Sequence, residues 1–210
     1  MQYLDQFLLI AVAHIIALMS PGPDFAIILK QSITHGREKS LWTSFGISIG
    51  ILVHVSYTVL GIGLIISKSI IIYTIIKYLA ALYLIYLGIK ALKSNSFKLD
   101  KFEKGKTQKE ITKFKAFSIG FFTNALNPKA TLFFLSLFTV IVDINTPLYI
   151  QGSYAVFFVI STFLWFGFLS FVLTGKKVRG FFNSFGKIFD KVIGVILIAL
   201  GIKVAMSEMW

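Results

Sequence analysis

Two proline motifs interrupt hydrophobic segments that are long enough to cross a bilayer. The first is SPGPD, from Ser20 to Asp24, and the second is LNPK, from Leu126 to Lys129. Their first prolines are 107 residues apart in a chain of 210, and the tetrapeptide LGIK also occurs twice, at 87–90 and at 200–203. Backbone that leaves helical hydrogen bonding is tolerated at membrane depth only where protein or a watery cavity satisfies it. The pairing therefore predicts a duplicated membrane unit with a transport site at its two breaks.

The composition is that of an integral membrane protein. Hydrophobic residues make up 56% of the chain and charged residues 14%, with a mean hydropathy of +0.81, which excludes an ordinary soluble domain. The chain has no cysteine, which excludes disulfides, thiolate metal sites and cysteine nucleophiles. The first apolar segment, Phe7 to Met19, is followed by PGP rather than by a small-residue cleavage site. It is therefore predicted to be retained as the first helix.

The basic residues gather in alternate connections, which argues against nucleic acid as a partner despite the net charge of +12. Of the 21 lysines and arginines, 17 lie within residues 30–39, 90–115 and 176–191. This is the positive-inside pattern, so these three connections are predicted to lie in the cytoplasm and both termini outside.

Six spans fit the sequence, each with at least the roughly 20 residues that a bilayer core requires. Because each half contributes three spans, the second copy enters the membrane from the opposite side. The predicted fold is therefore an all-α integral membrane protein of two inverted three-helix repeats, with helices 1 and 4 broken. The repeats are expected at 1–92 and 115–210, joined by a basic cytoplasmic linker at 93–114. The spans are expected at Leu4–Leu29, Leu41–Ile66, Ile70–Ala91, Lys115–Val142, Leu148–Thr174 and Phe185–Met206.

Lys129 reaches the predicted middle of the bilayer. It is 14 residues from both Lys115 and Asp143, which is about 20 Å along a helix in either direction. Its side chain is too short to reach water over that distance, so it is predicted to face protein or a cavity.

Ser20 and Asn127 are good N-cap residues, and each precedes a proline, which a helix accepts at its first position. Each motif is therefore predicted to start a half-helix whose free N–H groups and positive dipole end bind an anion such as a substrate carboxylate. The alternative is that the prolines only kink two packed helices. The predicted substrate-binding residues are Ser20, Pro21, Gly22, Pro23, Asp24, Asn124, Asn127, Pro128 and Lys129.

Asp24 is the only carboxylate well inside a predicted span, and an intramembrane acid is by default a functional hypothesis. It is predicted to bind a substrate ammonium or a coupling proton, or else to stabilise its half-helix or pair with Lys129. Gly46, Gly50 and His54 share one helix face at i, i+4 and i+8. The glycines are predicted to allow close helix packing, and His54 is a candidate for proton coupling or for a structural hydrogen bond.

Two further positions follow from helical spacing. Asn124 shares a face with Gly120 and Asn127 and is predicted to line the same interior. His14 has no such context, so it is expected to be a packing or interfacial histidine.

At these motifs the chain resembles the LysE/RhtB family of amino-acid exporters, over essentially its whole length. The resemblance implies export of amino acids or their derivatives across the bacterial cytoplasmic (inner) membrane, driven by a proton gradient and without a cofactor. The matching elements are SPGPDFAIIL at Ser20 to Leu29, His35-Gly36 followed by Arg37, the GxxxGxxxH pattern from Gly46 to His54, YLIYLGIKAL at Tyr83 to Leu92, and GFFTNALNPKATLFF at Gly120 to Phe134.

Within that family, PGP combined with a histidine in the second span is similar to the RhtB branch, which is associated with homoserine, threonine and other neutral amino acids. Exporters of lysine and arginine more often carry an acidic residue in that span, so His54 favours a neutral substrate. Asp24 departs from the family pattern, in which asparagine is frequent, and leaves a preference for cations open.

The leading prediction is a secondary transporter rather than an enzyme, with no catalytic or metal-binding residues. Its predicted partners are an amino-acid substrate, protons and the lipid bilayer, and a homo-oligomer is compatible with the sequence. The chain has no phosphate-binding loop, which argues against ATP hydrolysis. One alternative is an ion or metal exporter, with His14, Asp24 and His54 as candidate buried ligands. The other is a membrane-embedded lipid-modifying enzyme, which requires a cluster of acids or histidines near an interface.

Overall fold

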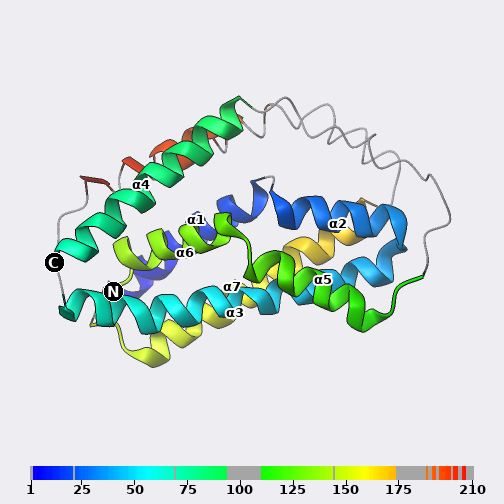
Figure 1. Ribbon diagram of the computed structural model, residues 1–210, viewed down its shortest axis with the longest axis horizontal. Coiled ribbons are helices and arrows are strands. Elements are labelled where there is room, and N and C mark those ends of the chain that lie inside the picture. The colour runs from blue at the N-terminus through cyan, green and yellow to red at the C-terminus, as the bar shows by residue number, and fades with distance from the viewer. Residues whose placement is uncertain are drawn as a thin grey trace.

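The computed structural model describes residues 2–20, 22–68, 70–93, 110–143 and 145–173, together with 188, 191–192, 194–199, 201–202 and 205–206. Within these ranges the chain forms α-helices joined by short turns, and no strand occurs among them. The all-α class is therefore confirmed. The helices pack side by side as an elongated bundle (Figure 1).

The first proline motif divides one apolar segment into two helices. α1 spans Gln2–Met19 and α2 spans Pro23–Thr34, and the two are bent by 52° relative to each other. Pro23 has no N–H to donate to the carbonyl one turn earlier, so the helix cannot continue through it undisturbed.

The second proline motif divides its segment in the same way. α5 spans Lys113–Ala125 and α6 spans Pro128–Val140, with Leu126 and Asn127 between them. Figure 1 shows that the two broken segments run in opposite directions along the bundle, α1 and α2 from left to right and α5 and α6 from right to left. Both breaks fall at the predicted motifs. The inverted repeat itself stays a prediction.

α3, which spans Gly36–Lys68, is the central element and contacts α2, α4, α5, α6 and α7. Its closest neighbour is α5, because both helices present glycine where they cross. A Cβ on Gly46 would overlap the carbonyl oxygen of Phe117, and a Cβ on Gly120 would overlap that of Thr43. Since lipid offers no hydrophobic force between helices, small residues that admit close backbone contact are a main source of association in membranes.

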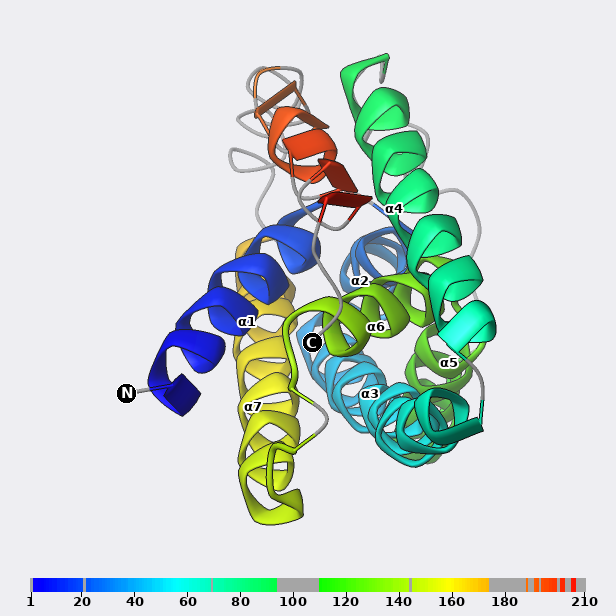
Figure 2. The same cartoon turned by 90° about the vertical axis from the view of Figure 1, so that its left-hand side faces the viewer.

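The remaining helices flank this centre. α4 spans Ile70–Leu92, and α7 spans Leu148–Val172. α4 lies against the helical residues between 188 and 206 (Figure 2), where the Cβ positions of Gly88 and Gly194 each fall within 2.7 Å of the other residue's carbonyl oxygen.

The exposed side chains of this bundle are largely apolar, as expected where lipid replaces water. α1 exposes Leu4, Leu8 and Val12, and α7 and α4 expose similar rows. In the described part of the chain, residues 36–61 and 148–172 are each long and apolar enough to cross a membrane, and the bent α1–α2 pair adds a third segment. The chain is thus a helical membrane protein, and the count of six spans stays a prediction.

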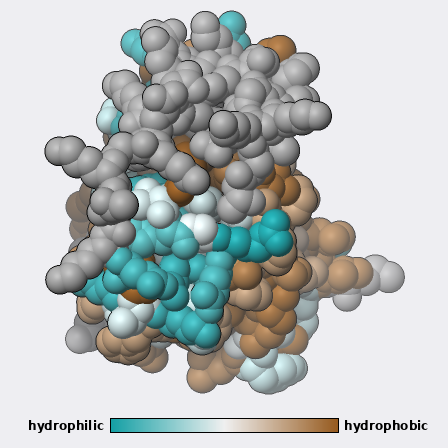
Figure 3. All heavy atoms as spheres, turned by 90° about the vertical axis from the view of Figure 1, so that its right-hand side faces the viewer, coloured by the Kyte–Doolittle hydropathy of each residue, from teal (hydrophilic) through white to brown (hydrophobic). Residues whose placement is uncertain are grey.

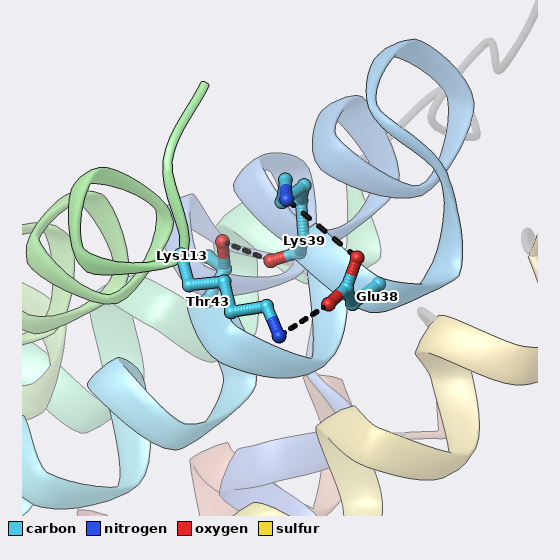
Figure 4. A network of polar contacts seen from close by, with 4 residues as sticks. All are labelled: Glu38, Lys39, Thr43 and Lys113. Atoms are coloured by element: carbon cyan, nitrogen blue, oxygen red, sulfur yellow. Dashed lines mark hydrogen bonds and ion pairs between the residues drawn. The ribbon is translucent and has the colours of Figure 1, made fainter. Parts of the chain in front are cut away.

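One end of the bundle is polar. The junction of α2 with α3 and the start of α5 meet there, and Figure 3, which faces this end, shows hydrophilic side chains gathered beside hydrophobic flanks. Glu38 lies between two lysines from different helices, with its carboxylate oxygens 2.8 Å from Lys113 Nζ and 3.6 Å from Lys39 Nζ (Figure 4). The hydrogen bond and charge of Lys113 hold the pKa of the exposed Glu38 carboxyl below its usual value.

Candidate functional site

The second break is built around Asn127 and a carbonyl that has lost its helical partner. The Asn127 side chain accepts a hydrogen bond from the Lys129 N–H at 3.0 Å and so caps α6, which starts at Pro128. In an unbroken helix the Asn124 carbonyl would accept from the N–H of residue 128, but proline has none. His54 Nε2 lies 2.9 Å from that carbonyl oxygen and supplies a donor from α3.

The first break differs from the prediction. Ser20 does not cap α2, because the N-cap position is Gly22, in an extended conformation, with Pro23 at the first helical position. The second proline of the motif therefore starts the helix, two residues later than a cap at Ser20 requires. Ser20 is buried, and its carbonyl accepts a hydrogen bond of 2.8 Å from Lys129 Nζ. Pro21 lies outside the described residues.

Asp24 joins the two breaks. Asn124 Nδ2 and Asn127 Nδ2 both donate to its Oδ2, at 3.0 and 3.1 Å. Its other oxygen, Oδ1, is buried and has no hydrogen-bond partner among the described residues. The carboxylate also lies in the first turn of α2, where the helix dipole stabilises negative charge. A carboxylate with one buried, unpaired oxygen has unused capacity to accept a hydrogen bond from a cation or to take a proton.

A cavity of about 50 Å³ lies between these groups. That is room for roughly three to five water molecules. Its polar wall comes from the two breaks, and its apolar wall comes from α1, α2, α3, α6 and α7. The lining residues are His14, Ala17, Leu18, Ser20, Gly22, Asp24, Phe25, Ile51, Asn124, Asn127, Lys129, Ala130, Phe133, Phe134 and Phe166.

Six of the nine predicted binding residues thus line one cavity: Ser20, Gly22, Asp24, Asn124, Asn127 and Lys129. Two others, Pro23 and Pro128, start their helices but are exposed and do not line it. Lys129 faces the interior, and its long side chain passes 3.3 Å from where a Cβ of Gly22 would lie.

His54 and the two glycines before it lie beside this cavity rather than in its wall. The His54 ring is fully buried, its Nδ1 is 2.8 Å from Tyr57 Oη, and it stacks on Phe134 with an interplanar angle of 4°. A Cβ on Gly50 would lie 3.0 Å from the Asn124 side chain. Gly46 and Gly50 therefore let α3 approach α5 closely enough for His54 to reach the break.

The His14 ring packs in the interior, as one of its two predicted roles requires, with its centre 4.8 Å from that of Phe158. Its place in the cavity wall and the burial of Lys77 were not predicted. His14 is 2% exposed, lines the cavity, and has its Nε2 3.2 Å from Thr162 Oγ1, whereas its Nδ1 has no hydrogen-bond partner among the described residues. Its position six residues before Ser20 in the broken segment was the available signal. Lys77, on α4, is also buried, with its Nζ 5.1 Å from the centre of the Tyr78 ring.

The fold and this site define a class of protein: a helical membrane protein with a polar cavity between two broken segments. Residues 15–208 match the LysE type translocator family, and the chain belongs to that family.

The relatives are similar over nearly their whole length. The chain is 32% identical to the membrane protein YrhP of Bacillus subtilis (strain 168), with 95% of this chain and 99% of that protein covered. It is 29% identical to the threonine efflux protein of Escherichia coli (strain K12), covering 96% and 98%. It is 28% identical to the leucine efflux protein of Salmonella choleraesuis (strain SC-B67), covering 94% and 93%. No solved structure matches the chain.

Proposed function

We propose that this protein exports a small neutral amino acid from the cytoplasm in exchange for protons, through the cavity between the two breaks. The observation that carries the proposal is that one acid, Asp24, and one base, Lys129, line the same cavity and come from different broken segments. Intramembrane charges are costly and mark transport pathways more often than packing.

The charge pattern of the cavity fits a zwitterion. A substrate ammonium would bind the free oxygen of Asp24, and the substrate carboxylate would bind Lys129 Nζ together with the positive end of α6. Both protein groups already make hydrogen bonds across the breaks, to the Asn124 and Asn127 amides and to the Ser20 carbonyl. The substrate would replace or share these bonds, and its binding would thereby act on both segments at once.

The apolar wall supports a substrate with an uncharged side chain. Four phenylalanines, Phe25, Phe133, Phe134 and Phe166, line the cavity. A lysine or arginine side chain would need a second acid in the cavity wall, and Asp24 is the only carboxylate among the lining residues. The names of the relatives, threonine and leucine efflux proteins, agree with a neutral substrate.

Coupling to protons follows from competition at Asp24. A carboxylate in this position can hold a proton or pair with a substrate ammonium, but it cannot do both well. If the proton enters from outside and the ammonium from the cytoplasm, each binding event requires release of the other. Export would then run on the proton gradient, with the two halves rocking around the site.

The test uses the purified protein in liposomes, with labelled threonine and leucine inside or outside and an imposed pH gradient. Asp24→Asn should raise KM, because it loses the charge that pairs with the ammonium, but at saturating substrate it should still exchange substrate at equal concentrations and should no longer accumulate it against a gradient. Lys129→Met should reduce transport of both amino acids by about 30-fold or more, the usual effect of removing one partner of a buried charge interaction.

Matched controls carry the same substitutions on exposed groups, Asp5→Asn on α1 and Lys30→Met on α2. Both controls should transport like the wild type. Wild-type liposomes that move neither amino acid, or an Asp24→Asn protein that accumulates substrate normally, would overturn the proposal.

A further inference from the structure

The sequence makes His54 a candidate for proton coupling or for a structural hydrogen bond, and its surroundings favour the second. We infer that His54 is a positioning residue: it replaces the hydrogen bond that Pro128 cannot make and thereby fixes Asn124 against Asp24. This inference rests on the proposed transport function, because its effect is expressed in substrate binding.

The second break lacks one backbone hydrogen-bond donor. Pro128 has no N–H, so the Asn124 carbonyl loses its helical partner at a depth where water is scarce. The carbonyl does accept from the Asn127 N–H at 2.8 Å, but a carbonyl oxygen has two lone pairs. His54 Nε2, 2.9 Å away, adds a side-chain donor to the same oxygen. Since a carbonyl can only accept, the Nε2 atom must carry the hydrogen.

The His54 ring is held in one orientation by its neighbours. With the hydrogen on Nε2, the Nδ1 atom of a neutral ring accepts from the Tyr57 hydroxyl, 2.8 Å away. One ring face stacks on Phe134, with the centroids 5.8 Å apart. The ring is fully buried and does not line the cavity. Both nitrogens are therefore engaged in hydrogen bonds, and neither lies in the cavity wall.

Asn124 connects the hydrogen bond from His54 to the candidate site. Asn124 uses its backbone carbonyl for His54 and its side-chain Nδ2 for Asp24 Oδ2, at 3.0 Å. Its side chain has little freedom, because α3 approaches at Gly50, where a Cβ would lie 3.0 Å from Asn124 Cβ. Fixing the backbone carbonyl of Asn124 therefore also fixes the position of its side-chain amide. Loss of the His54 donor frees the last turn of α5 and weakens the contact that orients the Asp24 carboxylate.

The experiment compares two substitutions that cannot carry a proton and differ only in the donor. Gln in His54→Gln has an N–H that can reach the Asn124 carbonyl, whereas Met in His54→Met has a similar shape and no donor. If His54 positions Asn124, His54→Gln should keep gradient-driven accumulation, with KM within about threefold of the wild type and an unchanged pH profile. His54→Met should raise KM by about tenfold, the effect of losing one buried hydrogen bond, while the maximal accumulation ratio stays the same.

A proton carrier gives the opposite pattern, because both variants would lose accumulation equally and keep exchange at equal concentrations. That result overturns the inference but leaves the proposed function standing, whereas a wild-type protein without transport would remove the function itself. Ser56→Ala, which changes an exposed residue on the same helix, serves as the control.

If His54→Met does not fold, Tyr57→Phe provides the second test. It removes only the hydroxyl next to Nδ1 and leaves the ring in place. Positioning predicts a higher KM with the same maximal accumulation ratio. A lost accumulation ratio would instead make Tyr57 and His54 a proton pathway and overturn the inference.

Discussion

The crossing of α3 and α5 offers a sharp test of how the site is assembled, through the substitution Gly46→Ala. A Cβ at this position would overlap the carbonyl oxygen of Phe117 and lie 2.8 Å from the backbone nitrogen of Phe121, where ordinary Cβ contacts are 3.4–4 Å. Both obstacles are backbone atoms of α5, so no side-chain rotation relieves them. The two helices must move apart.

The magnitude follows from two opposing effects. Overpacking of a close contact costs about 1–3 kcal/mol, and replacing glycine by alanine within a helix returns up to about 1 kcal/mol of helix propensity. The net destabilisation is therefore about 0–2 kcal/mol, which lowers the unfolding temperature of a protein of this size by up to roughly 8 °C. Gly152→Ala is the matched control, because a Cβ on Gly152, in α7, meets no atom within 4 Å. It should leave the unfolding temperature unchanged or raise it.

The assay is thermal unfolding in detergent, followed by transport in liposomes for the protein that survives. Because Gly46 and His54 lie on one face of α3, moving this helix away from α5 should also lengthen the bond from His54 to Asn124. Gly46→Ala is therefore expected to raise KM as well as to destabilise the folded protein. Equal unfolding temperatures for Gly46→Ala and Gly152→Ala would refute the close approach of the two helices.

Two other predictions concern the polar end of the bundle and the orientation of the chain. Lys113 lowers the pKa of Glu38, so the stabilisation from this pair is present at neutral pH and is lost as the pH falls through the lowered pKa. The small difference in unfolding temperature between the wild type and Glu38→Gln should therefore vanish in acid. It should also shrink as the salt concentration rises. With 17 of 21 basic residues in alternate connections, Lys104→Cys should react with an impermeant thiol reagent only after the cells are opened. Labelling in intact cells would contradict that orientation.

The positions of both breaks could be predicted because proline acts locally. Pro23 and Pro128 have no N–H group and therefore interrupt a helix whatever surrounds it. Asn127 caps α6 by accepting a hydrogen bond from the N–H of Lys129, only two residues further along the chain. The assignment of Ser20 as a cap failed for an equally local reason. PGP contains two prolines, and either can start a helix. Only the conformation of Gly22 shows that the second one does.

The partners within the site could not be predicted, because they depend on how the helices are rotated about their axes. Periodicity places Asn124 and Asn127 on one face of the fourth span, but it does not say that both amides meet the same oxygen of Asp24. Likewise, the glycines of α3 predicted a close contact without naming Gly120 as its counterpart. The place of His14 in the cavity wall was not predicted, because it depends on neighbours on α6 and α7.

The cross-links between the breaks constrain how an exporter of this design can move. Lys129 donates to Ser20, and two asparagines of the second break donate to Asp24 of the first. Hydrogen bonds to charged groups contribute about 1.5–3 kcal/mol each, so a rocking motion that parts the two segments is opposed by bonds located at the site itself. A ligand shifts such an equilibrium only by binding one state better than the other. In the proposed mechanism, a zwitterion bound at Asp24 and Lys129, or a proton bound at Asp24, would do so directly, because it would occupy groups that hold the two segments together.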